Sequence, residues 1–258
     1  MTTALPNRLI SVIIPALNEE LGIRNTISSI PLKELRDTFG YDVEILVIDG
    51  NSTDQTRDVA RKAGAQVIVE KQPGYGRAYK TGFAAARGDI IVTLDADNTY
   101  PAESIPQYIR KFNECNADFM TINRFAHLEK GAMSITRMVG NKILALLISL
   151  MYSISLKDSQ SGMWIMKKSF ISKVRINSND MSMSEEIKII AFKFFSSLEI
   201  DGVYRKRLGE AKLDTIQHGW KNMKYLIEYK KHLRSALKPL TVTTNEIRLG
   251  PSNRPARI

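Results

Sequence analysis

The sequence predicts an α/β fold: a Rossmann-like, mostly parallel sheet with helices on both faces, followed by C-terminal amphipathic helices. In the first hundred residues, short apolar runs alternate with helix-forming segments, which is the pattern of βαβ units. The apolar runs, such as "SVIIP" and "EILVI", are nearly continuous, as expected of strands that are buried on both faces. With 258 residues, 43% of them hydrophobic, the chain can build one large domain around a proper core.

The expected elements of the first half follow a regular order. Strands are predicted at 9–15, 43–49, 65–70 and 89–94, each followed by a helix, at 18–30, 52–64, 76–88 and 101–115. Asn18 is expected to open the first helix, and Ser52 with Gln55 to form a capping box for the second. Gly64 and Gly88 are expected to end the second and third helices. Pro101 is expected in the first turn of the fourth helix, where proline is favoured.

The second half is less regular. A strand is predicted at 117–125, a long and increasingly apolar helix at 131–156, and a polar loop leading into a short strand over 157–170. An amphipathic helix (181–197), a strand (198–207), a loop (208–214) and a basic helix (217–238) follow. We therefore expect a main domain over 1–215, a basic amphipathic helix over 216–238 that suits a membrane surface, and a disordered tail over 239–258.

Charge and composition limit the partners. A net charge of +10 favours an anionic partner: nucleic acid, an anionic membrane or a phosphorylated substrate. The single Cys115 excludes a disulfide framework and suits a reducing compartment. We expect no signal peptide at the N-terminus. The apolar run 143–156 is shorter than a spanning helix and is predicted to be either a buried helix or an interfacial segment.

Acidic residues follow several predicted strands. In "DIIVTLDADNTYP", Asp95 and Asp97 are two positions apart, so in extended chain both point to the same face. Two like charges side by side favour a cation between them, and carboxylates suit Mg²⁺ or Mn²⁺. Asp49 ends a neighbouring strand, and Glu19 follows the first strand. The alternative is that Asp97 or Asn98 caps the next helix.

Five motifs, in the order "SVIIPALNEE", "VIDGNSTDQT", "PGYGRAYKTGFAAARGDIIVTLDADNTYP", "DSQSGMWIMKK" and "YRKRLGEAKL", carry a family resemblance. Together they resemble family-2 glycosyltransferases with the GT-A fold, and in particular dolichyl-phosphate mannose synthases and related polyprenyl-phosphate sugar transferases. The resemblance implies inverting transfer of a hexose or N-acetylhexosamine from a UDP- or GDP-linked donor to a polyprenyl (dolichyl) monophosphate, with Mg²⁺ or Mn²⁺ as cofactor. The basic helix over 217–238, with no spanning helix predicted, favours a peripheral protein on an anionic membrane surface, at the cytoplasmic face. The sequence has no recognised nucleic-acid motif, so no nucleic-acid partner is expected.

The same resemblance implies residue roles. The nucleotide would be bound by Pro15, Ala16, Asn18, Glu19, Asp49, Gly50, Ser52, Lys80, Asp95, Ala96, Asp97, Arg207 and Lys212. The acceptor phosphate would be held by Arg124, Arg137 and Asn141, and the donor sugar would lie near Asp158, Ser161 and Gly162. Asp95, Asp97 and Arg207 would be catalytic, and the metal would lie at Asp95, Asp97 and Thr99.

Two departures from the family pattern concern the donor. Met163 and Trp164 stand where relatives often have Phe-Arg, and Thr99 stands where mannose synthases usually have a glutamine. Three alternatives remain open. The acceptor could be a soluble molecule or a saccharide, for which Glu185 or Glu186 would serve as the base; the positive charge could serve nucleic-acid binding; or the chain could be an inactive sensor of sugar nucleotides.

Overall fold

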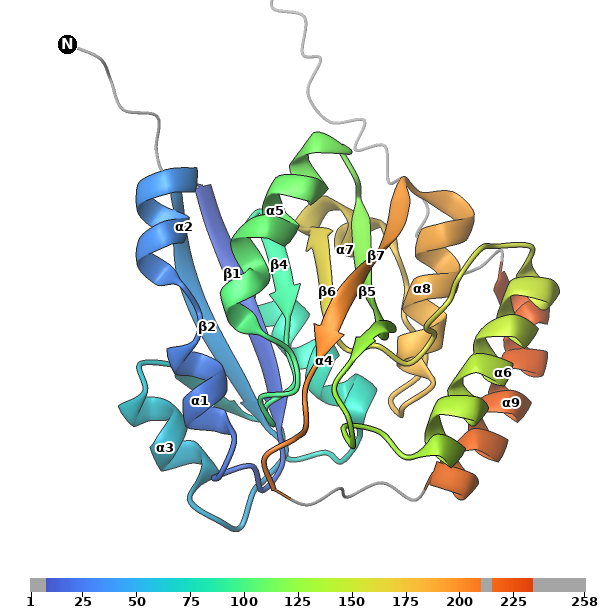
Figure 1. Cartoon of the computed structure of the whole chain (residues 1–258), viewed down its shortest axis with the longest axis horizontal. Helices are drawn as coiled ribbons and strands as arrows, with labels where there is room; N and C mark the ends of the chain where they lie inside the picture. Colours follow the sequence, from blue (N-terminus) through green and yellow to red (C-terminus); the bar gives the residue numbers. More distant parts are fainter. Residues whose placement is uncertain (1–7, 210–214, 234–258) are drawn as a thin grey trace, which may run out of the picture.

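The computed structural model describes residues 8–209 and 215–233. Within these residues, seven strands form one mixed sheet in the order β3-β2-β1-β4-β6-β5-β7 (Figure 1). The strands are β1 (Arg8–Ala16), β2 (Tyr41–Asp49), β3 (Gln66–Val69), β4 (Ile90–Thr93), β5 (Phe119–Leu128), β6 (Trp164–Lys167) and β7 (Ser197–Tyr204). All neighbours pair in parallel except β6, which is antiparallel to both β4 and β5. The predicted α/β class and mostly parallel sheet are confirmed.

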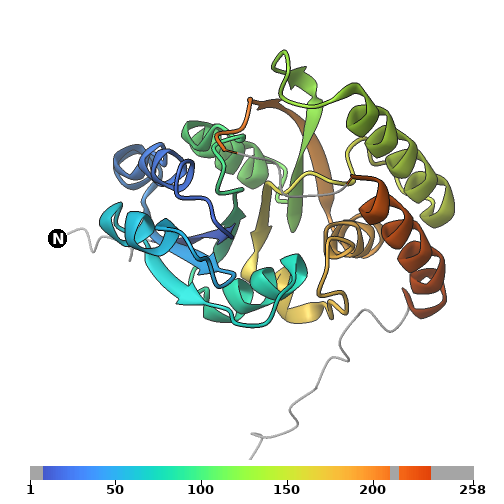
Figure 2. The same ribbon diagram turned by 90° about the horizontal axis from the view of Figure 1, so that it is seen from below.

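Helices cover both faces of the sheet. They are α1 (Ile23–Ser28), α2 (Leu32–Phe39), α3 (Thr56–Lys62), α4 (Tyr75–Ala85), α5 (Ile105–Glu114), α6 (Ile135–Tyr152), α7 (Lys168–Lys173), α8 (Met183–Phe194) and α9 (Thr215–His232). Because side chains alternate along a strand, Val12 and Ile14 join the core under α1, α2, α3 and α5. Ile13, between them, joins the core under α4, α7 and α8. Figure 2 shows helices on both sides of the sheet.

The two helices α6 and α9 lie side by side at the β7 end of the sheet, outside α8 (Figures 1 and 2). The hydroxyl of Tyr152 on α6 donates to the carbonyl of Leu226 on α9 at 2.6 Å. The hydroxyl of Tyr225 donates to the Glu186 carboxylate on α8 at 2.7 Å. The basic helix α9 is therefore packed onto the fold, while the predicted boundary after residue 215 stays a prediction. The predicted tail, 239–258, lies outside the described residues.

The structure corrects several helix ends. The first helix begins at Ile23, because Asn18 has a φ of 51° and its side chain instead accepts a hydrogen bond from the backbone N–H of Thr53 at 2.8 Å. The predicted capping box is wrong: α3 begins after Gln55, and Ser52 accepts from the Asn18 backbone N–H at 2.9 Å. Both polar side chains tie two loops together instead of capping helices.

Three further differences concern glycine, proline and an unexpected helix. The helix α4 ends before Gly88, where a Cβ would lie 2.6 Å from the backbone nitrogen of Ser11, so the glycine permits close packing against β1. Pro101 precedes a short 3-10 helix, Ala102–Ser104, and not a first α-helical turn. The helix α2 was not predicted from the sequence; it is eight residues long, and Leu35 is its one buried side chain.

Candidate functional site

One edge of the sheet collects the ends of several strands. Ala16 pairs with Asp49, and Asp49 pairs with Val69, so the loops after β1, β2 and β3 start level with one another. The antiparallel strand β6 begins at the edge where β4 ends, because Val92 pairs with Ile165. The loop before β6 therefore reaches the same edge, which is where open α/β sheets bind ligands.

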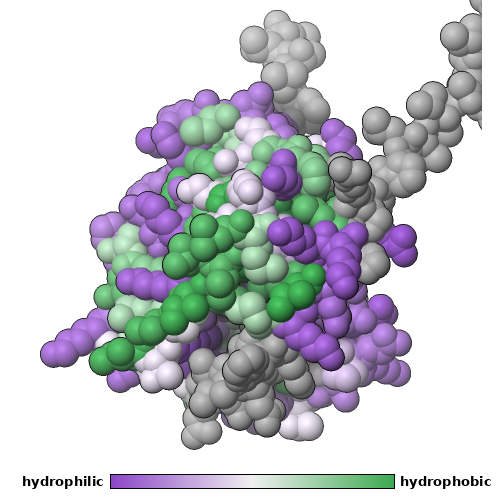
Figure 3. All heavy atoms as spheres, turned by 90° about the vertical axis from the view of Figure 1, so that its right-hand side faces the viewer, coloured by the Kyte–Doolittle hydropathy of each residue, from purple (hydrophilic) through white to green (hydrophobic). Residues whose placement is uncertain are grey.

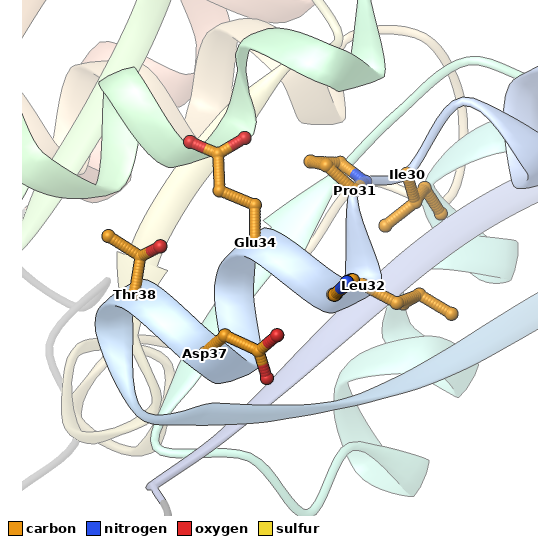
Figure 4. A pocket seen from close by; sticks show the side chains of 7 residues that line it. Ile30, Pro31, Leu32, Glu34, Asp37 and Thr38 are labelled. Atoms are coloured by element: carbon orange, nitrogen blue, oxygen red, sulfur yellow. The ribbon is translucent and has the colours of Figure 1, made fainter.

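A cavity of about 340 Å³ opens at this edge. Ten of the predicted site residues line it: Pro15, Ala16, Glu19, Gly50, Asp95, Ala96, Asp97, Arg124, Arg137 and Arg207. They come from segments that are far apart in sequence, so the tertiary fold brings them together. A second hollow, of about 560 Å³, lies on α2 (Figure 4). It is a shallow surface feature away from the strand ends, and its acidic side chains, Glu34 and Asp37, point in different directions in Figure 4.

Two carboxylates stand at the end of β4, where a metal-binding pair was predicted. Asp97 Oδ1 accepts hydrogen bonds from the backbone N–H of Thr99 at 3.2 Å and from its hydroxyl at 2.7 Å. Thr99 thus holds the Asp97 carboxylate and does not line the cavity. Burial, and then the charge of Asp97, raise the pKa of Asp95 to about 7. Such a pair is more stable when a cation lies beside it.

The two carboxylates of Asp95 and Asp97 fit a divalent cation whose other coordination positions are taken by a phosphate ligand and water. The described part of the chain has no group of three or more His, Cys, Asp or Glu side chains placed to hold a metal ion. Mg²⁺ often uses only one or two protein carboxylates, which Asp95 and Asp97 could supply here. Phosphate and water oxygens complete its coordination shell. The alternative of a helix cap gains no support, because Pro101 occupies the cap position and no side chain caps that helix.

An arginine faces these carboxylates. Arg207, three residues beyond β7, places Nη2 3.0 Å from Glu19 Oε1 and 3.7 Å from Asp97 Oδ2. Its backbone segment is fixed by a hydrogen bond from the Leu208 N–H to the Asp97 carbonyl at 3.0 Å. The Nε of Arg207 is buried and has no hydrogen-bond partner among the described residues. A phosphate oxygen in the cavity is the kind of acceptor that this N–H lacks.

A second arginine, Arg124, is buried beneath the cavity. Its Nε and Nη2 donate to the two carboxylate oxygens of Asp158 at 2.6 and 2.8 Å, and both side chains are at most 3% exposed. Burial raises the pKa of Asp158, but the charge and hydrogen bonds of Arg124, together with the charge of Lys188, outweigh it and hold that pKa below its usual value. Lys188 on α8 donates to the carbonyls of Asp158 and Ser161 at 3.1 and 2.8 Å. The loop before β6 is therefore fixed from two sides.

The predicted sugar-pocket residues do not line the cavity themselves but belong to the loop before β6, which packs against it. Asp158 and Ser161 are fully buried, and the Ser161 hydroxyl accepts from the Tyr100 hydroxyl at 3.3 Å. A Cβ on Gly162 would lie 2.6 Å from Asp95 Oδ1. Only glycine therefore lets this loop approach the carboxylate, which gives the "SG" pair a physical reason.

Other predicted residues do not line the cavity. Asp49 is fully buried; its Oδ1 accepts from the Ser52 N–H at 3.0 Å, and its Oδ2 has no partner among the described residues. The amine of Lys80 donates to the 177–179 loop, to the Asn177 carbonyl and to Asn179 Oδ1, each at 2.9 Å. The remaining predicted residues away from the cavity are Asn18, Ser52, Thr99 and Asn141. Lys212 lies outside the described residues.

Sequence reasoning missed several cavity residues: Glu70, Gln72, Tyr75, Gln160, Met181 and Tyr204. Of these, only Glu70 could have been found from the sequence pattern. It is an acid directly after β3, just as Asp95 is an acid that follows β4 after one residue. Hydrogen bonds from the Thr81 hydroxyl and the Gln72 N–H, and the charge of Arg77, lower the pKa of Glu70. It is thus held as a carboxylate at the cavity wall. No motif marks the others.

The candidate bases Glu185 and Glu186 on α8 are both fully buried and do not line the cavity. Glu186 accepts from the backbone N–H groups of Asn177 and Ser178, each at 2.8 Å. One oxygen of Glu185 accepts from Gln160 and from Asn222 on α9, and its other oxygen has no partner among the described residues. These carboxylates hold loops and α9 in place.

Glu185 makes the free energy of unfolding depend on pH. Burial raises its pKa from 4.5 to about 7, so the folded chain binds a proton that the unfolded chain releases, and stability falls as pH rises between these values. We expect Glu185→Gln to remove a pH-dependent loss on the order of 3 kcal/mol between about pH 4.5 and 7. Urea unfolding across this range measures it. The exposed Glu114→Gln serves as the control, and identical pH slopes for wild type and Glu185→Gln would contradict the assignment.

Comparison with known proteins places these features in a family. Residues 11–175 match the model of Glycosyl transferase family 2. A dolichyl-phosphate hexose transferase of Haloferax volcanii is 30% identical over 212 residues, covering 81% of this chain and 89% of its own. A low-salt glycan biosynthesis hexosyltransferase of the same organism is 32% identical over 84% of this chain, but the match spans only 53% of that longer protein.

A further relative and a solved structure also resemble this chain. A dolichol-phosphate mannosyltransferase of Pyrococcus furiosus is 27% identical over 89% of this chain and 64% of its own length. The crystal structure of glucosyl-3-phosphoglycerate synthase from Mycobacterium tuberculosis, in complex with Mn²⁺, UDP-glucose and phosphoglyceric acid, superposes with a TM-score of 0.67 at 23% identity. That match covers 86% of this chain and 79% of the other, and it supports the GT-A fold. The family match covers well over half of the residues, and this chain belongs to glycosyl transferase family 2.

Proposed function

We propose that this chain is an inverting, metal-dependent hexosyltransferase that moves a sugar from a UDP- or GDP-linked donor to a polyprenyl (dolichyl) monophosphate at a membrane surface, on its cytoplasmic face. The observation that carries the proposal is the composition of the cavity: Asp95 and Asp97 line it together with Arg124, Arg137 and Arg207. Carboxylates for a cation and arginines for phosphates suit a ligand with a diphosphate and an acceptor with another phosphate. The names of the Haloferax and Pyrococcus relatives support the lipid acceptor.

The chain's own residues would divide the work between the two substrates. Pro15, Gly50 and Glu70 lie at or just beyond the carboxyl ends of β1, β2 and β3 and line the cavity there, where the nucleoside would bind. Arg207 would donate to the departing diphosphate, and Arg137, at the start of α6, would donate to the acceptor phosphate. A divalent cation between Asp95 and Asp97 would supply electrostatic stabilisation of the leaving group.

A hydroxyl acceptor would need a carboxylate to act as general base. Each carboxylate among the described cavity residues already has another role, which favours a phosphate acceptor. The carboxylates among the described cavity residues are Glu19, Glu70, Asp95 and Asp97. Glu19 is paired with Arg207, Glu70 accepts from Thr81 and Arg77, and the two aspartates form the proposed cation site. A lipid monophosphate is largely dianionic at neutral pH, so it can attack the anomeric carbon, with inversion, without a base.

The test is transfer of label into the organic phase. Radiolabelled UDP- and GDP-sugars are incubated with the full chain, Mg²⁺ or Mn²⁺, and one of three acceptors: polyprenyl phosphate, the unphosphorylated polyprenol or a soluble saccharide. We expect label in the lipid fraction for one donor, with polyprenyl phosphate alone and only with metal present. Transfer to the saccharide would support the soluble-acceptor alternative and overturn the proposal.

A further inference from the structure

The helix α6 has two very different sides. Leu144, Ala145, Ile148 and Tyr152 are buried against the rest of the fold. The opposite side exposes an apolar stripe made of Ile135, Val139, Ile143, Leu146 and Leu150, which are between 47% and 76% exposed. Their spacing of three or four residues places them on one face of the helix. Figure 3 shows hydrophobic side chains gathered in a band on this side of the molecule, bordered by hydrophilic ones.

Cationic residues outnumber acidic ones in and around α6 and on the exposed part of α9. From Lys130 to Lys157 the sequence has four cations and no acidic residue. On the neighbouring helix α9, Lys224, Lys230 and Lys231 are exposed beside the half-exposed Ile227, with Glu228 as the acidic residue among them. A stripe of large apolar side chains with a positive rim matches a surface that is apolar within and negative outside, as an anionic bilayer is.

The α6 stripe begins at the same end of the helix as the proposed active site. Ala132 and Arg137, near the start of α6, line the cavity. Ile135 and Val139 are each two residues from Arg137, so they lie on the other side of the same helical turns. A smaller hollow of about 330 Å³ lies farther along, between α6 and β5, and is lined by Phe125, Lys142 and Leu146 among others. The end of α6 that lines the cavity would therefore lie close to a lipid surface contacted by the stripe.

We propose that α6 lies flat on an anionic lipid surface through this stripe, with the exposed lysines of α9 contacting the head groups. This inference rests on the proposed function and names the surface that presents the site to its lipid substrate. By length and hydropathy, α6 could cross a bilayer. Its packed side argues against spanning, because Tyr152 is hydrogen-bonded to α9 and Leu144 and Ile148 are buried in the core.

A second copy of the chain fits this face less well. A two-fold symmetric contact would place the stripe of one protomer on the stripe of the other. It would then bring the lysine-rich rims of both copies together, where like charges repel. An anionic bilayer carries the opposite charge, so the lysine residues are attracted to it.

The test is binding of the full chain to vesicles without any donor or acceptor. Sedimentation with vesicles of phosphatidylcholine mixed with phosphatidylglycerol is compared with phosphatidylcholine alone, at low and high salt. We expect binding to the anionic vesicles that weakens with salt. The triple variant Ile143→Gln/Leu146→Gln/Leu150→Gln should lower the partition coefficient by at least about tenfold, and Lys224→Gln/Lys230→Gln/Lys231→Gln should remove most of the salt dependence.

Controls separate this inference from the proposed function. Leu32→Gln changes an apolar residue of similar exposure on α2 and should bind as the wild type does. Transfer to a short-chain, water-soluble prenyl phosphate should be unchanged in the α6 variant, since its three residues do not line the cavity. Wild-type-like vesicle binding by the α6 variant would overturn the inference, as would a wild-type dimer in sedimentation velocity that the variant dissociates. Failure of the short-chain assay in the wild type would count against the proposed function alone.

Discussion

Replacing Asp97 by asparagine is expected to reduce sugar transfer by about a hundredfold to a thousandfold while the fold stays intact. The loss of preorganised electrostatic groups that stabilise a leaving group typically has effects of this size. Asparagine keeps an oxygen that can accept the two hydrogen bonds from Thr99, so the end of β4 should keep its shape. The substitution removes the negative charge of Asp97, which together with that of Asp95 would hold a divalent cation.

The assay for Asp97→Asn has two readouts. Initial rates of transfer with Mg²⁺ or Mn²⁺ give the catalytic effect, and calorimetric binding of the nucleoside diphosphate with and without metal gives the binding effect. We expect the variant to lose the metal dependence of nucleotide binding. The matched control is Asp37→Asn, an exposed aspartate on α2 (Figure 4), which should retain full rate. Wild-type turnover in Asp97→Asn would remove Asp97 from the mechanism.

Replacing Asp158 by alanine is expected to cost about 3–5 kcal/mol of stability. Removal of one partner of a buried ion pair leaves the other charge without compensation, and losses of this size are typical. The Arg124 guanidinium has its Nε and Nη2 on Asp158 and lies in a site that is almost closed to solvent. The variant would also release the backbone N–H of Gln160, which donates to Asp158 at 3.0 Å, so the loop before β6 should loosen.

Equilibrium unfolding in urea measures this loss. The matched control is Asp42→Ala, which breaks the exposed pair with Arg36 at 3.0 Å and should cost no more than about 1 kcal/mol. The double variant Arg124→Met/Asp158→Ala removes both charges and should recover much of the stability, even if the single variant fails to fold. A single variant as stable as Asp42→Ala would show that the buried pair does not support the fold.

The fold class was predictable from local patterns because strand and helix periodicity are short-range properties. The runs that became β1, β2 and β4 are continuous and apolar, since both faces of each strand meet a helical layer. Helix starts were less predictable, since Asn18 and Ser52 have the residue types of caps but find better partners in each other's loops. A side chain's choice between local and distant partners cannot be read from spacing.

By itself, the sequence determined the α/β order and the family motifs, and the family resemblance pointed to ten of the residues that line the cavity. Only the tertiary structure decided which acids stay at the cavity and which are withdrawn from it. Glu70 entered the cavity wall, whereas Glu185 and Glu186 were taken into the interior by α8. It alone also revealed that one side of α6 is core and the other is open to solvent. The physical reason is that burial is set by what packs against a residue, and those neighbours come from distant parts of the chain.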